Sequence, residues 1–531
     1  MISLRRATAV MTVGTVFSRI TGLLRLFAIA AALGIAEPGS LADTYNLANT
    51  APNIIYELIL GGILTSVFVP VFVELLEKEG KERAWEVASA LINVSLAVLV
   101  AIATLGIIAA PLIAKFYTLN VDGPRLEAQQ EALTFMLRLF IPQIIFYGLA
   151  ALTAGLLNAH RRFGPPMYTP ILNNLAVIAV FLAFYQAYEK VTLEGASTRQ
   201  LLIIGLGTTG GVVLMALAQL PFLRGLGRYR PVFSLRHPSV KKLARLSLFV
   251  IGYVMVNQVG YLIIQVLAAG QQGGYAAYVN AFTFFMLPHG LFAVSVITAL
   301  LPGMSAHFVN DERMEFRERL STGIRSTILL VLPAAIGYLV LGEPIIRLLL
   351  EHGNATAEST ELVTSVLRVF VLGLVPFSLF QLFLRAFYAM QDTKTPFLIN
   401  CGAVAVNTAI NIPMFAWLGV EGLAAGLAIA YTFGSFVQGR ALSKRIGGID
   451  GTHILRSTAR IGIASAGMGA AVWLASRIMA EIIGIGSLTG QIFQVGVPVV
   501  VGVGSYLALA ALFKVEELDM IRGLIGTRFK R

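Results

Sequence analysis

Two arginines lie inside the first long apolar stretch of the chain, in residues 17–25, FSRITGLLR. Arg19 and Arg25 are six residues apart, which on a helix separates them by about 120° around the axis and about 9 Å along it. A bend near Gly22 would bring both side chains toward one cavity, where Ser18 adds a hydroxyl group. Guanidinium groups bind phosphates and carboxylates as two-pronged donors. The pair therefore predicts a site for a pyrophosphate or a carboxylate.

The second apolar stretch supplies further polar groups. Asp43 and Glu57 are carboxylates that could pair with the two arginines, so a structural salt bridge is the alternative to ligand binding. Pro52 frees a backbone carbonyl and permits a kink, and Asn53 offers an amide to a cavity. Ser18 and Asn53 are therefore polar groups that could face the same cavity as the two arginines.

A later apolar stretch contains three asparagines, Asn400, Asn407 and Asn411. The last two are one helical turn apart and share a face. Such a polar stripe is either a candidate cation site, formed by Asn407 and Asn411, or a set of hydrogen bonds between helices. The second interpretation is favoured.

Catalytic patterns are missing from the sequence. It has no HExxH, no phosphate-binding GxxxxGK[ST] and no GxSxG motif. The six histidines lack ligand spacing, and the single cysteine, Cys401, excludes a cysteine-based metal cluster. We expect no catalytic residues, no metal site and no cofactor, so the protein is predicted not to be an enzyme.

The elements that carry these residues are set by composition. Of 531 residues, 57% are hydrophobic and 13% charged, and the mean hydropathy is +0.79. This excludes a soluble globular protein, and glycine and proline follow no fixed period, which excludes a collagen-like or disordered chain. About 14 apolar runs are long enough to cross a membrane as helices. The predicted fold class is an all-α polytopic membrane protein.

The basic residues predict the orientation of these spans. One set of connectors carries 29 lysines and arginines and the opposite set carries 5. Basic connectors face the cytoplasm, so both termini are predicted to be cytoplasmic. The net charge of +12 is explained by this rule, and nucleic acid is not expected as a partner.

The chain also resembles itself. At an offset of 230, residues 137–140 align with 367–370, and Ala159 and Pro166 align with Ala389 and Pro396. Six spans separate the halves, so the repeats run parallel. We predict an N-terminal lobe at 1–232, a C-terminal lobe at 233–450, and an extra helix pair with a basic tail at 451–531. Repeated bundles that rock against each other are typical of transporters.

Several motifs resemble the MurJ (MviN) lipid II flippase family of the MOP exporter superfamily. They are residues 17–25, Ala42 and Asp43, Pro52 and Asn53, 68–70, 157–163, Pro166, 170–173 and 388–396, YAMQDTKTP. The resemblance covers nearly the whole chain. It implies two parallel six-helix lobes, a C-terminal pair that forms a groove for a polyprenyl tail, and a cationic cavity between the lobes for the head group and pyrophosphate. The resemblance also implies that Arg19 and Arg25 are substrate-binding residues of this cavity, with Ser18, Asp43 and Asn53 as polar partners.

This sequence departs from the family pattern at four positions. Leu26 follows the second arginine where many members have Asp, and Tyr56 stands where they carry Arg. Phe282 and Phe285 precede Pro288 where members carry Arg and Glu. The second lobe therefore lacks the matching charges. Members with a sodium site have an acidic residue near the position of Asn411.

The predicted function is transfer of lipid II from the cytoplasmic to the outer leaflet of the bacterial plasma membrane, by alternating access, for cell wall synthesis. Expected partners are lipid II or a related polyprenyl-pyrophosphate precursor and membrane lipid. Coupling to a monovalent ion or to the membrane potential is expected. The alternatives are a MOP-type exporter of another lipid-linked oligosaccharide or an amphipathic drug, and a non-transporting scaffold of the cell envelope.

Overall fold

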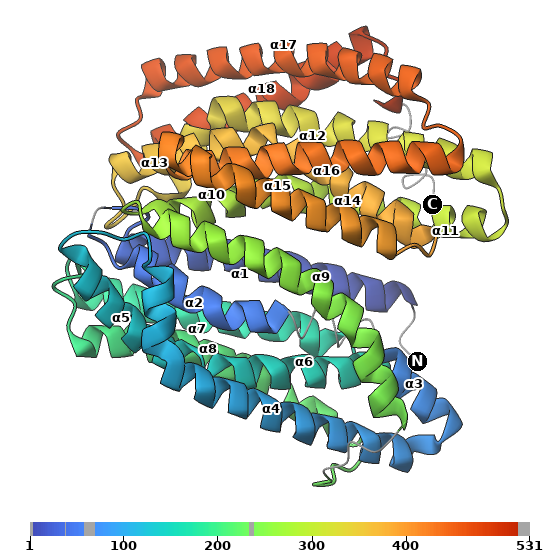
Figure 1. Cartoon of the computed structure of the whole chain (residues 1–531). Coiled ribbons are helices and arrows are strands. Elements are labelled where there is room, and N and C mark those ends of the chain that lie inside the picture. The colour runs from blue at the N-terminus through green and yellow to red at the C-terminus, as the bar shows by residue number, and fades with distance from the viewer. Residues whose placement is uncertain (1–3, 38, 58–68, 233–237, 519–531) are drawn as a thin grey trace. The chain divides into compact units, whose positions relative to one another are not determined.

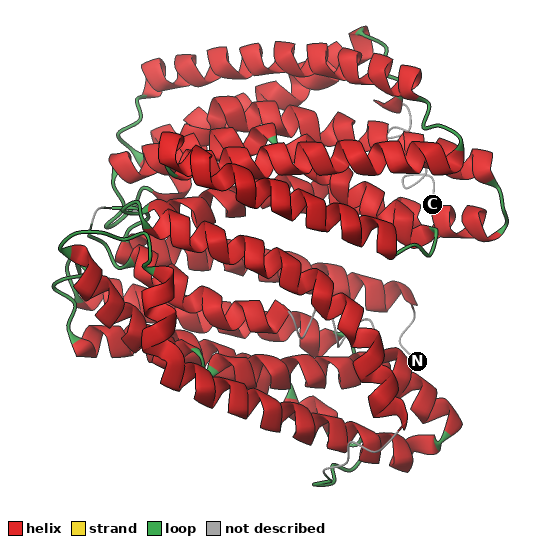
Figure 2. Ribbon diagram, viewed as in Figure 1, coloured by secondary structure: helices red, strands yellow, loops and turns green. Residues whose placement is uncertain are grey.

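The computed structural model describes the chain except residues 1–3, 38, 58–68, 233–237 and 519–531. Within helices, the side chains of 4–12, 55–57, 69–71, 73–74, 238–251 and 253 also lie outside the description. The described residues form helices joined by loops (Figures 1 and 2), with an isolated β-bridge between Ser40 and Thr192. The all-helical class is as predicted.

The chain divides into two compact units. Unit 1 comprises Met1–Tyr275 and His352–Thr356, and unit 2 comprises Ala276–Glu351 and Ala357–Arg531. The first nine α-helices are α1 Leu4–Leu33, α2 Ala42–Glu57, α3 Val69–Lys78, α4 Gly80–Tyr117, α5 Arg125–Phe140, α6 Gln143–Ala159, α7 Gly164–Ala187, α8 Thr198–Leu217 and α9 Pro238–Ala269, with the short 3₁₀ helix η2 Leu220–Leu223. They are followed by α10 Gly274–Pro288, the π-helical η3 His289–Ala293, α11 Val294–Val309, α12 Arg313–Leu350, α13 Ala357–Leu372, α14 Leu374–Ala389, α15 Lys394–Leu418, α16 Val420–Ile446, α17 Gly451–Ile483 and α18 Leu488–Leu512.

Among the described residues, 11 helices are long and apolar enough to cross a membrane, or 12 if α13 and α14, bent by 49°, form one span. The chain is therefore a polytopic membrane protein. The two other expected spans, centred near Leu60 and Val254, lie partly on residues or side chains outside the description. The number fourteen stays a prediction.

Helix boundaries repeat along the chain. The pair α6–α7 and the pair α14–α15 are separated by loops whose ends match at an offset of 230. Arg161 and Gln391, at equivalent positions, have positive φ angles of 58° and 57°. In each loop the next amide, of Arg162 or Asp392, donates to the carbonyl five residues earlier, a Schellman-type helix end. Likewise α4 and α12 both have 38 residues. The three-part division remains a prediction built on this duplication.

One hydrophobic core of unit 2 includes residues from α12, α17 and α18. Ile324, Ile328, Met468 and Tyr506 are buried there together. The Tyr506 hydroxyl also donates to the carbonyl of Leu329 over 2.7 Å. The C-terminal helix pair is therefore an integral part of unit 2.

Candidate functional site

Arg19 and Arg25 lie on α1, a single helix that continues unbroken through Gly22. Arg19 is exposed and Arg25 is half-buried. Among the described residues, no hydrogen bond or ion pair holds either guanidinium group. No described residue therefore neutralises either charge.

The face of α1 that packs on α7 fixes where these arginines point. Asn174 of α7 donates through Nδ2 to the Ser18 carbonyl, 3.2 Å away, and to Thr21 Oγ1, 3.0 Å away. Thr21 is buried. By helical geometry Arg25 lies about 40° from Thr21 around the axis, and Arg19 about 160°. Arg25 thus borders the α1–α7 contact and Arg19 lies on the opposite face of the helix.

Asp43 lies in the first turn of α2 and is 6% exposed. A carboxylate is stabilised at this end of a helix by the free backbone amides and the helix dipole. The Arg125 guanidinium of α5 is the cation that interacts electrostatically with it, and it also donates to the carbonyls of Ala269 and Gly270. Asp43 therefore interacts with a cation on α5, whereas the salt-bridge alternative placed its partner on α1. The side chain of Glu57 lies outside the described residues.

Asn53 follows the helix-breaking Pro52 inside α2. Its Nδ2 donates to the Asn49 carbonyl over 2.8 Å, so its amide is engaged on its own helix. One turn earlier, Thr50 is 2.8 Å from the hydroxyl of Tyr275, which in turn is 3.1 Å from that of Tyr261. The hydroxyl groups of Thr50, Tyr275 and Tyr261 thus link α2 to α10 and α9.

The amides of Asn407 and Asn411 bond to each other. Nδ2 of Asn411 donates to Oδ1 of Asn407 over 3.1 Å, and the reverse distance is 3.4 Å. Gly426 of α16 makes room for them, because a Cβ atom there would lie 2.0 Å from Asn411 Oδ1. Asn400, on the same helix, is also buried, and its Nδ2 has no hydrogen-bond partner among the described residues.

Aromatic rings surround Phe282 and Phe285 of α10. Phe285 is completely buried, with ring centres 5.4 Å from Phe370 and 5.5 Å from Phe377. Phe282 is half-buried and stacks on Phe285 at 5.7 Å. A charged side chain in this apolar cluster would be strongly unfavourable. This part of α10 therefore packs through aromatic rings.

The predicted substrate-binding residues lie on two helices of unit 1, with Ser18, Arg19 and Arg25 on α1 and Asp43 and Asn53 on α2. Two contributors were not predicted. Asn174 fixes α1 beside the arginines, and the pair Thr50 and Tyr275 fixes α2. The sequence signal for Asn174 was its position in the polar pair 173–174 within an apolar run. The described residues contain no group of three or more His, Cys, Asp or Glu that could hold a metal ion.

The described residues form a helical membrane protein with repeated helix ends, an architecture typical of transporters. In agreement, the fold is similar to an inward-facing multidrug resistance MATE family transporter of the MOP superfamily, with a TM-score of 0.66 and 14% identity over 81% of this chain and 94% of that one. It is more similar to a lipid II flippase MurJ in an inward closed conformation, with a TM-score of 0.77 and 22% identity over 96% and 99% of the chains.

Sequence comparison gives the family. The family described as lipid II flippase MurJ matches residues 29–493. A probable lipid II flippase MurJ of Rhizobium tropici is 30% identical over 96% of this chain and 95% of its own length. That of Haemophilus influenzae is 29% identical over 86% and 90%. The chain belongs to the MurJ lipid II flippase family, which makes it a transporter and not an enzyme.

Proposed function

We propose that this protein moves lipid II from the cytoplasmic to the outer leaflet of the bacterial plasma membrane by alternating access. Family membership over nearly the whole chain supports the cargo. The orientation with both termini in the cytoplasm follows from the asymmetry of basic connectors. Peptidoglycan synthesis at the outer surface would consume the transported precursor.

The observation that carries the site is the pair of arginines on α1 that have no hydrogen-bond or ion-pair partner among the described residues. A guanidinium group within a membrane helix is costly unless it is paired or faces water. Arg25 is half-buried with no described partner, so a pyrophosphate would supply the missing counter-charge. We assign Arg19 and Arg25 to this group, with Ser18, Asp43 and Asn53 as polar residues of the same site.

Energy coupling is proposed to come from the membrane potential. Moving one elementary charge through 100 mV is worth about 2.3 kcal/mol, enough to bias the return of an unloaded cationic site. The other candidate is a monovalent cation at Asn407 and Asn411. A cation there would have to displace the hydrogen bonds between the two amides, so we assign this pair to helix packing.

The test is complementation of a bacterium depleted of its own lipid II flippase. Wild-type protein should restore growth, and Arg25→Ala should lose it, with a loss of flipping in vesicles of about tenfold or more, as expected for removal of a charged hydrogen bond to an anion. Arg477→Ala is the matched control, because Arg477 packs over the ring of Trp473 at 4.7 Å and is not assigned to the site.

Each outcome has a definite meaning. Growth rescue by Arg25→Ala at wild-type level would remove the proposed site while keeping the cargo. Failure of a well-expressed wild-type protein, both in cells and in vesicles that contain lipid II, would remove the cargo itself. Vesicles that contain another polyprenyl-pyrophosphate oligosaccharide then test the alternative substrate class.

A further inference from the structure

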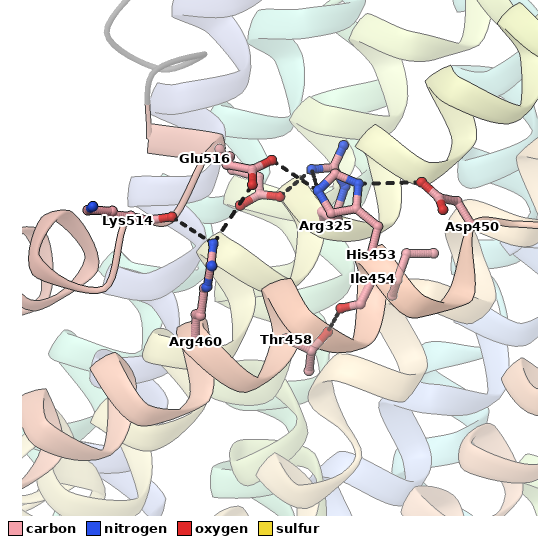
Figure 3. A network of polar contacts seen from close by, with 9 residues as sticks. Arg325, Asp450, His453, Ile454, Thr458, Arg460, Lys514 and Glu516 are labelled. Carbon is pink, nitrogen blue, oxygen red and sulfur yellow. Dashed lines mark hydrogen bonds and ion pairs between the residues drawn. The ribbon is translucent and has the colours of Figure 1, made fainter.

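A cluster of charged side chains joins three segments of unit 2, at the end where α17 begins and α18 ends (Figure 3). The segments are the middle of α12, the first turns of α17 and residues 514–518, which follow α18. Its members are Arg325, Asp450, His453, Arg460, Glu516 and Glu517.

The innermost contact is an ion pair between α12 and the segment after α18. Arg325 Nη1 lies 2.6 Å from Glu517 Oε1, and these side chains are only 11% and 1% exposed. Val515 and Leu518, on either side of Glu517, are buried in the hydrophobic core. Because removing one partner of a buried pair leaves an uncompensated charge, this contact fastens residues 514–518 to unit 2.

His453 lies between this pair and the solvent, and one of its ring nitrogens has two competing neighbours. Nε2 is 3.0 Å from Glu516 Oε2, an acceptor, and 3.4 Å from Arg325 Nη1, a donor. A protonated Nε2 can donate only to Glu516, whereas a bare Nε2 can accept only from Arg325. On the other side, Nδ1 is 3.4 Å from Asp450 Oδ2. The imidazolium form alone can serve both carboxylates at once.

The charges around His453 favour the same conclusion. The carboxylates of Asp450, Glu516 and Glu517 face two guanidinium groups, those of Arg325 and Arg460, so a proton on His453 completes the balance. The exposed Arg456 lines the adjoining recess and makes no ion pair with another described residue. The hydrogen bond from His453, together with attraction to the ring and both arginines, lowers the pKa of Glu516 despite slight desolvation.

We propose that His453 is a proton-controlled latch. With the ring protonated, His453 ties Glu516 to Asp450 and so holds residues 514–518 against the start of α17. With the ring neutral, its single N–H can serve only one of the two carboxylates, so the bridge between Glu516 and Asp450 is broken. Protonation of His453 therefore closes the latch, and loss of that proton loosens it. On the predicted orientation, the C-terminal helix pair thereby responds to cytoplasmic pH.

Hydrogen–deuterium exchange of the full-length protein in lipid nanodiscs tests the latch. Exchange is measured at pH 6 and pH 8 and corrected for the intrinsic pH dependence of amide exchange. In the wild type, protection of amides in 514–518 should fall by about threefold to tenfold on going to pH 8, since one pKa unit of difference between two states corresponds to a factor of ten. Protection in α4 should not change.

Three variants make the result specific. His453→Gln keeps a donor but does not titrate, so its protection should be the same at both pH values. Glu516→Gln, at a side chain that is 61% exposed and thus safe for folding, should reduce the change. His307→Gln removes another histidine paired with a carboxylate, Glu312, at 2.6 Å, and should behave like wild type. An unchanged wild type, or an equal pH response in His453→Gln, overturns the proposal.

Discussion

Arg25 and Asn174 occupy neighbouring positions and have opposite roles. The side-chain amide of Asn174 donates hydrogen bonds to two acceptors on α1, the Ser18 carbonyl and Thr21 Oγ1. These bonds fix the rotation of that helix. Arg25, about one turn from Thr21, has no such partner among the described residues. At the scale of single residues, Asn174 thus has a structural role. Arg25 has no partner among the described residues, and we propose that it binds an anion.

Substitution of Asn174 should therefore weaken the contact between α1 and α7. We expect Asn174→Ala to lower stability by about 0.6–2 kcal/mol, the range for hydrogen bonds between membrane helices, and Asn174→Asp to cost more, because a carboxylate would face the Ser18 carbonyl. Thermal unfolding in detergent measures both. Asn53→Ala is the control, since that amide bonds to its own helix; an equal effect there would contradict the assignment.

Asp392 controls the loop before α15. Its Oδ1 accepts from the backbone amides of Lys394 and Thr395, each over 3.0 Å, and its Oδ2 pairs with Arg445. Desolvation acts to raise the pKa of Asp392, but the hydrogen bonds with Thr395 and Arg445 outweigh it and the pKa is lowered from its ordinary value of 3.8. The ionised form therefore stabilises the folded state.

The sign of the pH dependence follows from this lowered pKa. The stabilisation is fully present above about pH 4 and is lost as the pH falls through the lowered pKa. Wild-type melting temperature should fall in that window, and Asp392→Asn should melt lower at pH 6 with a weaker acid dependence. Asp122→Asn, at an exposed loop carboxylate, serves as control. Equal acid dependence in Asp392→Asn and wild type would refute this role.

At the scale of elements, α16 approaches its neighbours through small residues one turn apart. They are Gly422, Gly426, Ala430 and Gly434. A Cβ atom at Gly422 would lie 2.1 Å from the Met414 carbonyl, and one at Gly434 would lie 2.8 Å from the Phe380 ring. Small residues at this spacing permit the close approach on which membrane helices depend, since lipid provides no hydrophobic force between them.

Gly426→Ala tests this stripe at the position facing the asparagine pair. Its methyl group would lie 2.0 Å from Asn411 Oδ1, so the amides of Asn407 and Asn411 must separate. We expect a loss of about 1–3 kcal/mol, typical of overpacking. Gly504→Ala in α18, which would meet no atom within 4 Å, should be neutral or slightly stabilising. Similar melting temperatures for the two variants would rule out tight packing at Gly426.

At the scale of the whole molecule, a strap from the second half of the sequence belongs to unit 1. Residues His352–Thr356 connect α12 to α13 yet are grouped with unit 1. Asn354 donates to the carbonyls of Ala31 and Ala32 at the end of α1. The buried carboxylate of Glu37 accepts from Thr356 N over 2.8 Å and from the amides of residues 35 and 36.

Neutralising Glu37 should loosen this strap. Glu37→Gln replaces one acceptor oxygen by a donor that faces backbone N–H groups, so exchange at the Thr356 amide should quicken by about tenfold, the equivalent of one charge-assisted hydrogen bond of about 1.5 kcal/mol. Hydrogen exchange of the full chain measures it. Glu189→Gln, at an exposed site, should leave the strap unchanged; no acceleration in Glu37→Gln would show that the carboxylate is dispensable.

The sequence alone determined the membrane class and the family, and it predicted the internal repeat. These depend on apolar run lengths, on identities at offset 230 and on motifs such as residues 17–25 and 388–396, all of which are local or periodic properties of the chain. The helix ends at Arg161 and Gln391 have the same backbone conformation, with positive φ angles, as the sequence identities at offset 230 predict.

Only the tertiary structure decided which polar groups are already paired. Asn53 and Asn411 are both polar groups in apolar runs, yet Asn53 bonds to a backbone carbonyl of α2 and Asn411 to the side chain of Asn407 on α15. The contact of Arg325 with Glu517 joins residues 192 positions apart, and no spacing rule predicts it. A side chain's partner depends on helix rotation and packing, which are set by many distant contacts together.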